Sequence, residues 1–370
     1  MTGSSYTLNN FLSPVVLFLQ RKNCLFLICN ANRLELNSKI RRLTFRQVGI
    51  ERKICLTSDL FALWALWRLF AREKLSAVHS MSPKAGLLAM AAAWLAGVSV
   101  RIHTFTGQVW ATRAGLMRWL LRQTDKLTAR LATHVLVDSP AQLRFLRAEG
   151  ILARKQGKVL AKGSVVGVDL GRFRPDPRSR LCLRRSLGIS QSSVVALFLG
   201  RFQPDKGLRD LCVAFNLAAP SAKNLHLLLV GPDEAGMANS LRELTREFSS
   251  RIHFGGPTEH PEEAMKAADF LVLPSYREGF GAVIIEAAAC AIPAIATRIY
   301  GLKDAVEEGK TGIFVPLRNP KALARAMLFF YRRPTQRKAM GRAALRRAQR
   351  DFEQGAVVRA IVRHHAEALG

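Results

Sequence analysis

The amino-acid sequence predicts an α/β protein built on two doubly wound parallel sheets. The chain has 370 residues, which is more than one hydrophobic core usually organises. Apolar residues make up 49% and charged residues 22%, proportions that are typical of globular proteins and exclude a disordered or fibrous chain. From residue 75 onward, short apolar runs without alternation recur between helical segments. This is the pattern of buried parallel strands joined by helices.

The first domain is predicted to cover residues 1–172. Its beginning indicates a helix at 11–20 and then a strand at 24–30. Later strands are predicted at 77–79, 101–105, 134–138 and 158–160, with helices at 86–95, 117–131 and 141–149 between them. Residues 31–57 are basic and weakly periodic, so no element is predicted there.

The second domain is predicted to cover residues 173–350 and to repeat this pattern. The boundary falls within 163–180, where glycine, proline and charge replace hydrophobic periodicity. Buried strands are predicted at 194–200, 225–231, 252–254, 270–274 and 294–297. We expect residues 351–370, which have helical spacing, to form a C-terminal helix that packs back toward the first domain.

The charge of the chain is unusual. It carries 56 Lys+Arg residues against 27 Asp+Glu residues, a formal net charge of +29. Residues 1–172 hold 26 basic and 8 acidic residues, hence +18, and the remaining 30 and 19 give +11. Such an excess indicates an acidic partner, and charge alone leaves nucleic acid, anionic lipid and a phosphorylated substrate open.

The sequence predicts neither a membrane span nor a metal site. The apolar stretch 11–29 is interrupted by polar and charged residues at 20–23, and 85–98 is too short to cross a bilayer. The six cysteines form no C-x-x-C pair, so we expect reduced, mostly buried thiols in a cytoplasmic protein. The segment 60–75, with two tryptophans beside basic residues, is explained either by an interfacial membrane helix or by an amphipathic helix that covers the sheet.

One candidate site follows the fourth buried strand of the second domain. Glu278 lies in the loop after that strand, and Glu286 lies two turns further on, in the next helix. The backbone N–H groups of Gly279, Phe280 and Gly281, at the start of this helix, are suited to receive an anion. Taken alone, the two glutamates are better explained as charges at a helix entry and on a solvent face.

The residues 200–207, GRFQPDKG, form a second candidate site. Arg201 directly follows an apolar strand, and Lys206 follows a Pro-Asp turn. Two cations at the carboxyl end of a parallel strand can hold a diphosphate, and ligands of open α/β sheets bind at that edge. A solvated turn is the alternative explanation for this segment alone.

Together these segments resemble the retaining glycosyltransferases of family 4, which have the GT-B architecture: two Rossmann-like domains that face a cleft. The matching pieces occur in the family's order, namely GSVVGVDLGRFRP (163–175), GRFQPDKG, LLLVGPDE (227–234), the E-x7-E segment FLVLPSYREGFGAVIIEAAACAIPAIAT and GKTGIFVP (309–316). The first half resembles acceptor domains of members that extend bacterial surface polysaccharides on a lipid carrier. Its matching pieces are VHSMSPKAGLLAMAAAWLAGV (78–98) and RIHTFTGQVWATR (101–113).

The resemblance implies roles for four side chains. Arg201 and Lys206 would bind the donor diphosphate, Glu278 would contact the transferred sugar, and Glu286 would contact the donor ribose. No metal or other cofactor would be needed. The implied partners are a nucleotide-diphosphate sugar, expected to be UDP-linked, a polyprenyl-diphosphate-linked or other lipid-linked saccharide, and the anionic inner face of the cytoplasmic membrane; no nucleic acid is expected.

The first domain departs from the family's pattern in two places. Many relatives have a histidine directly before the glycine of the second segment, where this chain has Thr106. His103 lies three residues earlier, and strand alternation turns it to the opposite face, where a lone histidine is more often structural than catalytic. Both His103 and Thr106 are kept as candidate catalytic residues beside Arg201, Lys206 and Glu278. The opening strand and loop of the relatives are also missing or replaced, which predicts an abbreviated N-terminal domain.

The predicted function is the retaining transfer of a hexose or N-acetylhexosamine to a lipid-linked saccharide, in polysaccharide or O-antigen (lipopolysaccharide) biosynthesis. Three alternatives stay open. The altered N-terminus is compatible with a donor-binding relative of impaired activity. A sugar-nucleotide epimerase of the same architecture would need more carboxylates and histidines in the first domain than the sequence offers. A nucleic-acid-binding protein would fit the charge, although no nucleic-acid-binding motif accompanies it.

Overall fold

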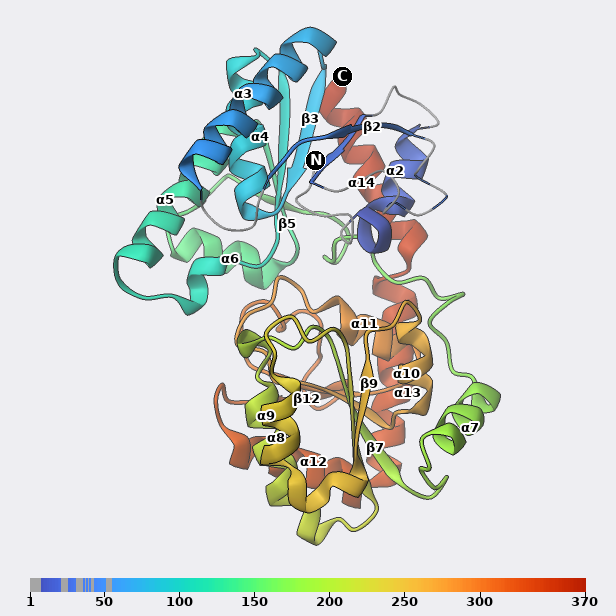
Figure 1. The fold of residues 1–370 in the computed structure, drawn as a ribbon. Coiled ribbons are helices and arrows are strands. Elements are labelled where there is room, and N and C mark those ends of the chain that lie inside the picture. The colour runs from blue at the N-terminus through green and yellow to red at the C-terminus, as the bar shows by residue number, and fades with distance from the viewer. Residues whose placement is uncertain are drawn as a thin grey trace. The chain divides into compact units, whose positions relative to one another are not determined.

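The computed structural model describes residues 8–20, 26–30, 36, 38, 40, 43–50 and 55–370. The chain divides into two compact units (Figure 1). Unit 1 is Met1–Gly167 together with Gly355–Gly370, and unit 2 is Val168–Gln354. Every strand pair of the described residues is parallel, so both units are α/β with parallel sheets, as the sequence predicted.

The two ends of unit 2 are bonded to each other. The Val168 N–H donates to the carbonyl of Phe352 over 2.7 Å, and the Gln354 N–H donates to the carbonyl of Val168 over 3.0 Å. These bonds form a short parallel bridge between Val168 and Glu353. The sequence placed the boundaries at residues 172 and 350, whereas the structure divides the chain after residues 167 and 354.

Unit 1 contains a four-stranded sheet in the order β3-β4-β5-β6 and a two-stranded sheet β1-β2. The strands are β1 (Phe26–Cys29), β2 (Thr44–Gln47), β3 (Ala77–Met81), β4 (Val100–Phe105), β5 (His134–Val137) and β6 (Lys158–Val159). The helices are α2 (Ser13–Gln20), α3 (Leu56–Glu73), α4 (Pro83–Leu95), α5 (Gly115–Leu131), α6 (Pro140–Ala148) and α14 (Gln354–Leu369). Residues 8–20 are helical throughout, and the predicted replacement of an opening strand concerns residues 1–7, which lie outside the described residues.

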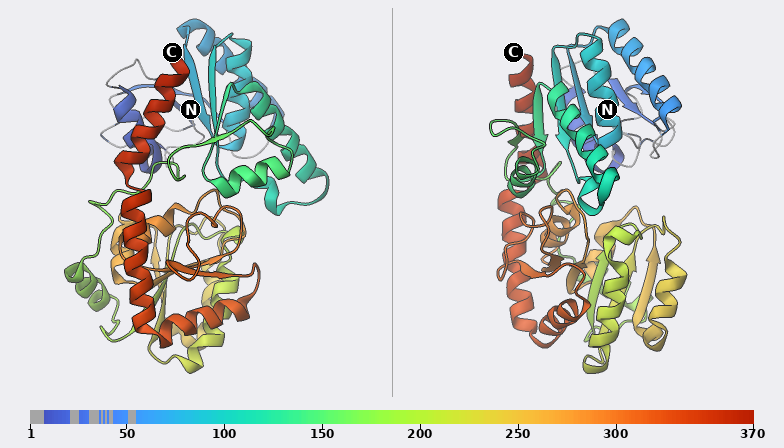
Figure 2. Two further views of the ribbon diagram at one scale, coloured as in Figure 1. Left: turned by 180° about the vertical axis from the view of Figure 1, so that it is seen from behind. Right: turned by 90° about the vertical axis from the view of Figure 1, so that its left-hand side faces the viewer.

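The two faces of the larger sheet are covered by different helices. Alternation along β3 and β4 turns Ser80 and His103 toward α4, and His79 and Thr104 toward α14. On the first face α3 packs against α4, and α4 packs against α5, so the three helices lie side by side (Figure 2). None of the described helices is both long and apolar enough to cross a membrane.

Unit 2 contains a six-stranded sheet in the order β12-β11-β10-β7-β8-β9. The strands are β7 (Val194–Leu199), β8 (Leu225–Val230), β9 (Ile252–Gly256), β10 (Phe270–Leu273), β11 (Ala294–Thr297) and β12 (Gly312–Val315). The helices are α7 (Pro177–Ser186), α8 (Leu208–Ala218), α9 (Ala238–Leu244), α10 (Pro261–Ala267), α11 (Ala282–Ala289), α12 (Pro320–Arg332) and α13 (Pro334–Asp351). The two central strands, β7 and β10, are apolar at every position because helices cover both faces, and four consecutive residues of β7, Val195 to Phe198, have no exposed surface.

Cys55, Cys182, Cys212 and Cys290 are free thiols. Cys212 and Cys290 are buried, as expected, and burial raises the pKa of each thiol to about 12. Cys55 is half-buried, and Cys182 on α7 is exposed.

Candidate active site

The candidate site lies at the carboxyl edge of the unit 2 sheet, where the strand order reverses. The chain runs outward from β7 through β8 to β9 and then returns to the other side of β7 with β10. Ligands of open α/β sheets bind at such a reversal, because the loops after the two strands diverge there. Arg201 and Lys206 follow β7 and Glu278 follows β10, so the sheet order brings the predicted residues to one place.

An ion pair joins the two diverging loops. The Lys206 Nζ donates to Glu278 Oε1 over 2.7 Å, and the hydroxyl of Ser275 donates to the same oxygen over 2.9 Å. Each side chain of the ion pair is only 15% exposed. The sequence analysis identified both charged residues, but nothing in their spacing showed that they contact each other.

Further contacts fix the backbone of these loops. The N–H of Tyr276 donates to the carbonyl of Asp205 over 2.7 Å, and the Asp205 carboxylate accepts from Arg277 over 2.6 Å. The hydroxyl of Tyr276 donates to Asp210 on α8 over 2.8 Å. The sequence analysis did not single out these four residues as site residues, because they are brought together only by the pairing of β7 with β10.

Two glycines allow backbone to pass very close to backbone. A Cβ on Gly207 would lie 2.2 Å from the carbonyl oxygen of Pro274, and Gly207 has a φ of +69°. A Cβ on Gly301 would lie 2.0 Å from the carbonyl oxygen of Glu278. The loop that carries Glu278 is therefore enclosed on two sides by residues without side chains.

Arg201 contacts a different acid. Its guanidinium donates to Glu234 Oε2 over 2.9 Å, and the amide of Gln203 donates to the same oxygen over 2.6 Å. Glu234 follows β8, the neighbour of β7 on the other side. Arg201 is 37% exposed, so it lies at the rim of the site rather than within it.

The start of α11 completes the edge. Gly281 is the N-cap, in a left-handed conformation, and no side chain caps the helix. Phe280 is 4% exposed and packs edge-on against Phe352, so it offers the site only its backbone. An uncapped helix N-terminus with glycines before it is suited to an anion, as the sequence analysis inferred.

Glu286 lies one turn inside α11. Burial raises the pKa of its carboxyl to about 7, and Arg172 opposes this shift while the charge of Glu262 adds to it. Arg172 itself is bonded to Glu262 over 2.8 Å. Glu286 is therefore balanced between its neutral and charged forms near neutral pH, which allows its carboxyl to donate or accept a hydrogen bond.

In unit 1, the side chain of His103 is buried. The ring is 1% exposed and is bonded to the hydroxyl of Ser80 over 2.8 Å. It packs so closely on α4 that a Cβ on Gly86 would lie 2.3 Å from it. Burial lowers its pKa to about 3, so the imidazole is neutral, and the structure does not bring it to the carboxyl edge of the sheet where Thr106 lies.

Thr106 directly follows β4 and is partly exposed. Its carbonyl accepts hydrogen bonds from the side-chain amides of Gln108 and Gln142, two buried residues that the sequence analysis missed. Asp138, at the end of the adjacent β5, is also buried, which raises the pKa of its carboxyl to about 8. A polar network thus supports the backbone at Thr106.

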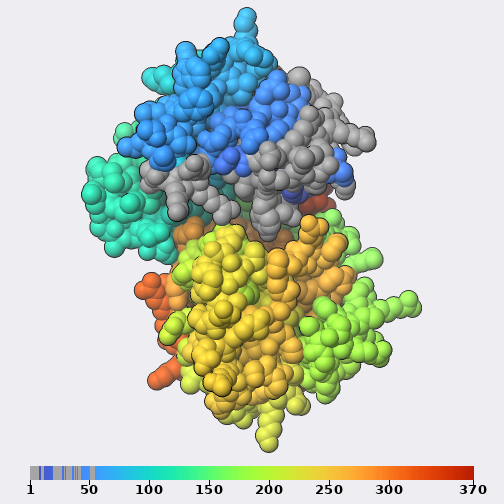
Figure 3. All heavy atoms as spheres, viewed as in Figure 1, coloured from blue at the N-terminus to red at the C-terminus, as the bar shows by residue number. Residues whose placement is uncertain are grey.

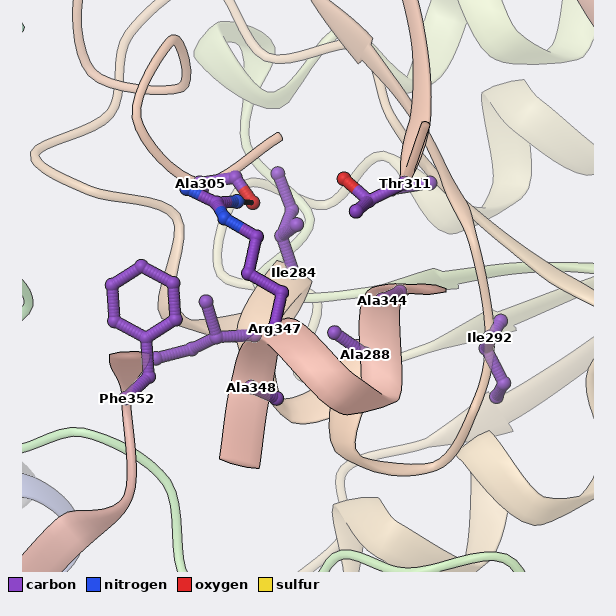
Figure 4. A pocket seen from close by; sticks show the side chains of 11 residues that line it. Ile284, Ala288, Ile292, Ala305, Thr311, Ala344, Arg347, Ala348 and Phe352 are labelled. Atoms are coloured by element: carbon purple, nitrogen blue, oxygen red, sulfur yellow. Dashed lines mark hydrogen bonds between the residues drawn. The ribbon is translucent and has the colours of Figure 1, made fainter. Parts of the chain in front are cut away.

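The small cavity behind α11 is distinct from this edge (Figure 4). Its volume is about 10 Å³, and it is enclosed by small and aliphatic residues of α11 and α13 together with Arg347. The guanidinium of Arg347 donates to the carbonyl of Ala305 over 2.7 Å and so fixes the loop between β11 and β12. A space this small is a packing defect rather than a ligand site. In the described part of the chain, no group of three or more His, Cys, Asp or Glu side chains is arranged to hold a metal ion.

Known families and relatives match both units. Residues 180–347 match the family described as glycosyl transferases group 1, and residues 30–160 match the glycosyl transferase 4-like domain. The capsular polysaccharide biosynthesis glycosyltransferase CapM of Staphylococcus aureus is 28% identical over 338 residues, which are 90% of this chain and 88% of CapM. The D-inositol 3-phosphate glycosyltransferase of Streptomyces avermitilis is 37% identical over 194 residues, but these are only 50% of this chain and 42% of that protein.

Solved structures share the fold. Anabaena Alr3699/HepE in complex with UDP superposes with a TM-score of 0.80 at 18% identity, covering 99% of this chain and 98% of HepE. WaaG, a glycosyltransferase involved in lipopolysaccharide biosynthesis, superposes with a TM-score of 0.73 at 15% identity, covering 97% and 95% of the two chains.

Proposed function

Because the chain is a glycosyltransferase with the GT-B fold, we propose that it moves a hexose or N-acetylhexosamine from a nucleotide-diphosphate sugar to a lipid-linked saccharide during bacterial surface-polysaccharide synthesis. The observation that supports this most directly is the Lys206–Glu278 pair at the reversal of the unit 2 sheet. CapM is named for capsular polysaccharide biosynthesis, and HepE has been solved with UDP and with UDP-glucose. We therefore infer a UDP-linked donor.

The donor would replace carboxylates that now face the two cations. Lys206 and Arg201 donate to Glu278 and Glu234, and the diphosphate oxygens would take over as acceptors. The uncapped start of α11 adds backbone N–H donors and the positive end of a helix dipole. Glu278, released from Lys206, would accept from hydroxyls of the transferred sugar, and Glu286 would bind the ribose hydroxyls.

The proposed reaction retains the anomeric configuration. The bond from the anomeric carbon to the diphosphate oxygen breaks, and the acceptor oxygen forms its bond to that carbon on the same face. The acceptor's proton passes to the departing diphosphate, so no protein nucleophile is required. Arg201, Lys206 and the helix N-terminus stabilise the charge that develops on the diphosphate, and this chemistry needs no metal ion. We place the reaction at the anionic inner face of the cytoplasmic membrane, where a lipid-linked acceptor would be presented.

Donor binding tests the site. Lys206→Ala and Glu286→Ala should each weaken UDP-sugar binding in calorimetry by about 1.5–3 kcal/mol, since each loses one charged hydrogen-bond partner. Lys223→Ala removes an exposed cation before β8, at the opposite edge of the same sheet, and should leave the affinity unchanged. Equal affinity in all four proteins, across a panel of nucleotides and nucleotide sugars, would remove the assignment of the site.

Turnover and product stereochemistry test the mechanism. Arg201→Ala should nearly abolish transfer, whereas Thr106→Val should reduce it only modestly, because the proposed proton acceptor is the diphosphate. Nuclear magnetic resonance of the product should show the anomeric configuration of the donor. An inverted product, or a loss in Thr106→Val as large as in Arg201→Ala, would contradict the mechanism.

A further inference from the structure

Exposed apolar side chains gather on one helical layer of unit 1. In the described part of the chain, sixteen large hydrophobic side chains are exposed, and twelve of them lie on α3, α4 and α5. These helices lie side by side on one face of the sheet (Figure 2), and α3 forms much of the blue surface in Figure 3. We call the outward side of the three helices the apolar face. Exposed apolar side chains that gather on neighbouring helices in this way mark an interaction surface.

Tryptophan dominates the apolar face. Four of the five tryptophans of the chain lie on it, namely Trp64 and Trp67 on α3, Trp94 on α4 and Trp119 on α5, with exposures between 40% and 57%. The fifth, Trp110, is 1% exposed. Exposed tryptophan is typical of surfaces at a membrane–water interface, because the ring is largely apolar and its N–H is polar.

The charges around the apolar face are positive. Arg68 lies over the Trp64 ring at 5.3 Å, and further basic residues follow toward the end of α3. The acids of α3 are both paired: Asp59 with Lys84 over 2.5 Å, and Glu73 with Arg72 over 3.4 Å. α4 has no acid, and the only acid of α5, Asp125, is buried and accepts from Trp110. The three helices carry seven basic and three acidic residues, and Arg118 and Arg122 of α5 pair with Glu149 beyond them. The apolar face therefore combines aromatic groups with an excess of positive charge.

We propose that the apolar face rests on an anionic lipid bilayer, with its tryptophan rings at the depth of the headgroups. This deepens the proposed function, on which it rests, by naming the surface that meets the membrane of the lipid-linked acceptor. Charge distinguishes the lipid from a second copy of the chain, because two copies with a net charge of +29 each would repel one another. An anionic bilayer instead attracts the arginines while the aromatic rings leave water.

Fluorescence quenching on the whole protein tests the proposal. Vesicles of phosphatidylglycerol with brominated acyl chains should quench the tryptophan emission of the wild type, whereas brominated phosphatidylcholine vesicles should quench it much less. A variant in which Trp64, Trp67, Trp94 and Trp119 are all phenylalanine should still float with anionic vesicles but lose the quenching, since only the buried Trp110 remains. Trp64→Glu combined with Trp119→Glu should lower vesicle binding at least about tenfold.

Matched control variants distinguish vesicle binding through the apolar face from nonspecific binding. Leu217→Glu and Leu317→Glu place the same charge at exposed leucines of unit 2 and should leave vesicle binding unchanged. Three results would each overturn the proposal. The wild type could bind anionic vesicles without quenching, the control variants could lose as much vesicle binding as the tryptophan variants, or light scattering could show a dimer that Trp64→Glu dissociates. UDP-sugar binding is measured in the same samples. A protein that binds UDP-sugar but not vesicles contradicts only this inference, whereas a protein that binds vesicles but not UDP-sugar contradicts only the proposed function.

Discussion

Glu286 illustrates how a buried ionisable residue opposes stability. Because burial raises its pKa to about 7, the folded state holds the proton more tightly than the unfolded chain, where the value is near 4.5. The free energy of unfolding therefore falls as the pH rises from about 4.5 through 7, and the full cost of the buried carboxylate is present above pH 7. Replacing Glu286 by glutamine keeps the shape of the side chain and removes its charge.

We accordingly predict that Glu286→Gln unfolds at the same temperature as the wild type at pH 5 and about 2–4 °C higher at pH 8, while it binds UDP-sugar more weakly. Scanning calorimetry at both pH values, with a donor titration, measures this. Glu247→Gln, at an exposed acid of the same unit, is the control and should show no such change with pH. A Glu286→Gln protein less stable at pH 8 than the wild type would contradict the prediction.

Gly301 provides a second prediction, on the geometry of the loop that carries Glu278. Gly301→Ala should weaken donor binding more than tenfold, because the added Cβ would lie 2.0 Å from the Glu278 carbonyl oxygen and displace this residue from Lys206. Isothermal titration of UDP-sugar measures the effect. Gly49→Ala, where a Cβ meets nothing within 4 Å, is the control. Normal affinity in Gly301→Ala would show that the position of this loop does not matter for the donor.

At the residue scale, the sequence identified charged side chains but not their partners. Lys206 and Glu278 are recognisable because they occupy loops after apolar strands, whereas Asp205 and Arg277 become neighbours only through the pairing of β10 with β7. The burial of His103 likewise depends on Gly86, which lies on another element. Such contacts between distant segments leave no trace in local periodicity.

Elements were predictable where helices cover a strand on both sides. All of the strands predicted after residue 75 occur. In β7 and β10 of unit 2 the reason is burial, because a parallel strand that is covered on both faces gives a continuous apolar run in the sequence. β2 escaped prediction because its four residues, Thr-Phe-Arg-Gln, are partly or fully exposed. β1 begins at Phe26, within the predicted strand 24–30, whose first residues lie outside the described part of the chain.

α14 depends on neutral histidines for its place in unit 1. His365 bonds His79 of β3 over 2.9 Å, and His364 packs edge-on against His134 of β5. Burial lowers the pKa of His79 and His365, and it lowers that of His364 to about 4. The unfolded chain binds protons below pH 6.5 that the folded state does not, so stability is complete above 6.5 and is lost as the pH falls toward 4.

We predict that His364→Leu raises the melting temperature of the protein at pH 5 more than at pH 7.5. Both ring nitrogens of His364 are buried without a hydrogen-bond partner in the described structure, so leucine removes unsatisfied atoms as well as a titrating group. Circular dichroism melts at the two pH values measure the change. His260→Gln, at an exposed histidine, is the control, and a pH dependence as steep in His364→Leu as in the wild type would refute the prediction.

At the scale of the whole molecule, composition located the two units but not their exact limits. The shift from periodic to glycine- and proline-rich sequence marks the passage between units, yet the boundary itself is set by the bridge between Val168 and Glu353. This bridge joins residues that are far apart in the chain. Local sequence cannot reveal it.

We predict that deletion of residues 355–370 destabilises unit 1 and leaves unit 2 able to bind UDP-sugar. The deletion removes Val357, Val358 and Ile361, which form a buried cluster with Val15 and Val166. Limited proteolysis should therefore digest residues 55–167 quickly and spare 168–354. Deletion of residues 366–370 alone keeps the cluster and serves as control; equal resistance of unit 1 in both truncated proteins would disprove the prediction.

The same cluster determines when each unit can finish folding on the ribosome. The first segment of unit 1 is translated before unit 2, but the valines and the isoleucine of 355–370 that close its cluster emerge only after all of unit 2 has been translated. Domains usually fold in the order of their synthesis. Here unit 2 is complete first, while unit 1 still exposes the apolar side chains that residues 355–370 later cover. The nascent chain is therefore most prone to aggregation in the interval after unit 2 has folded and before these residues emerge.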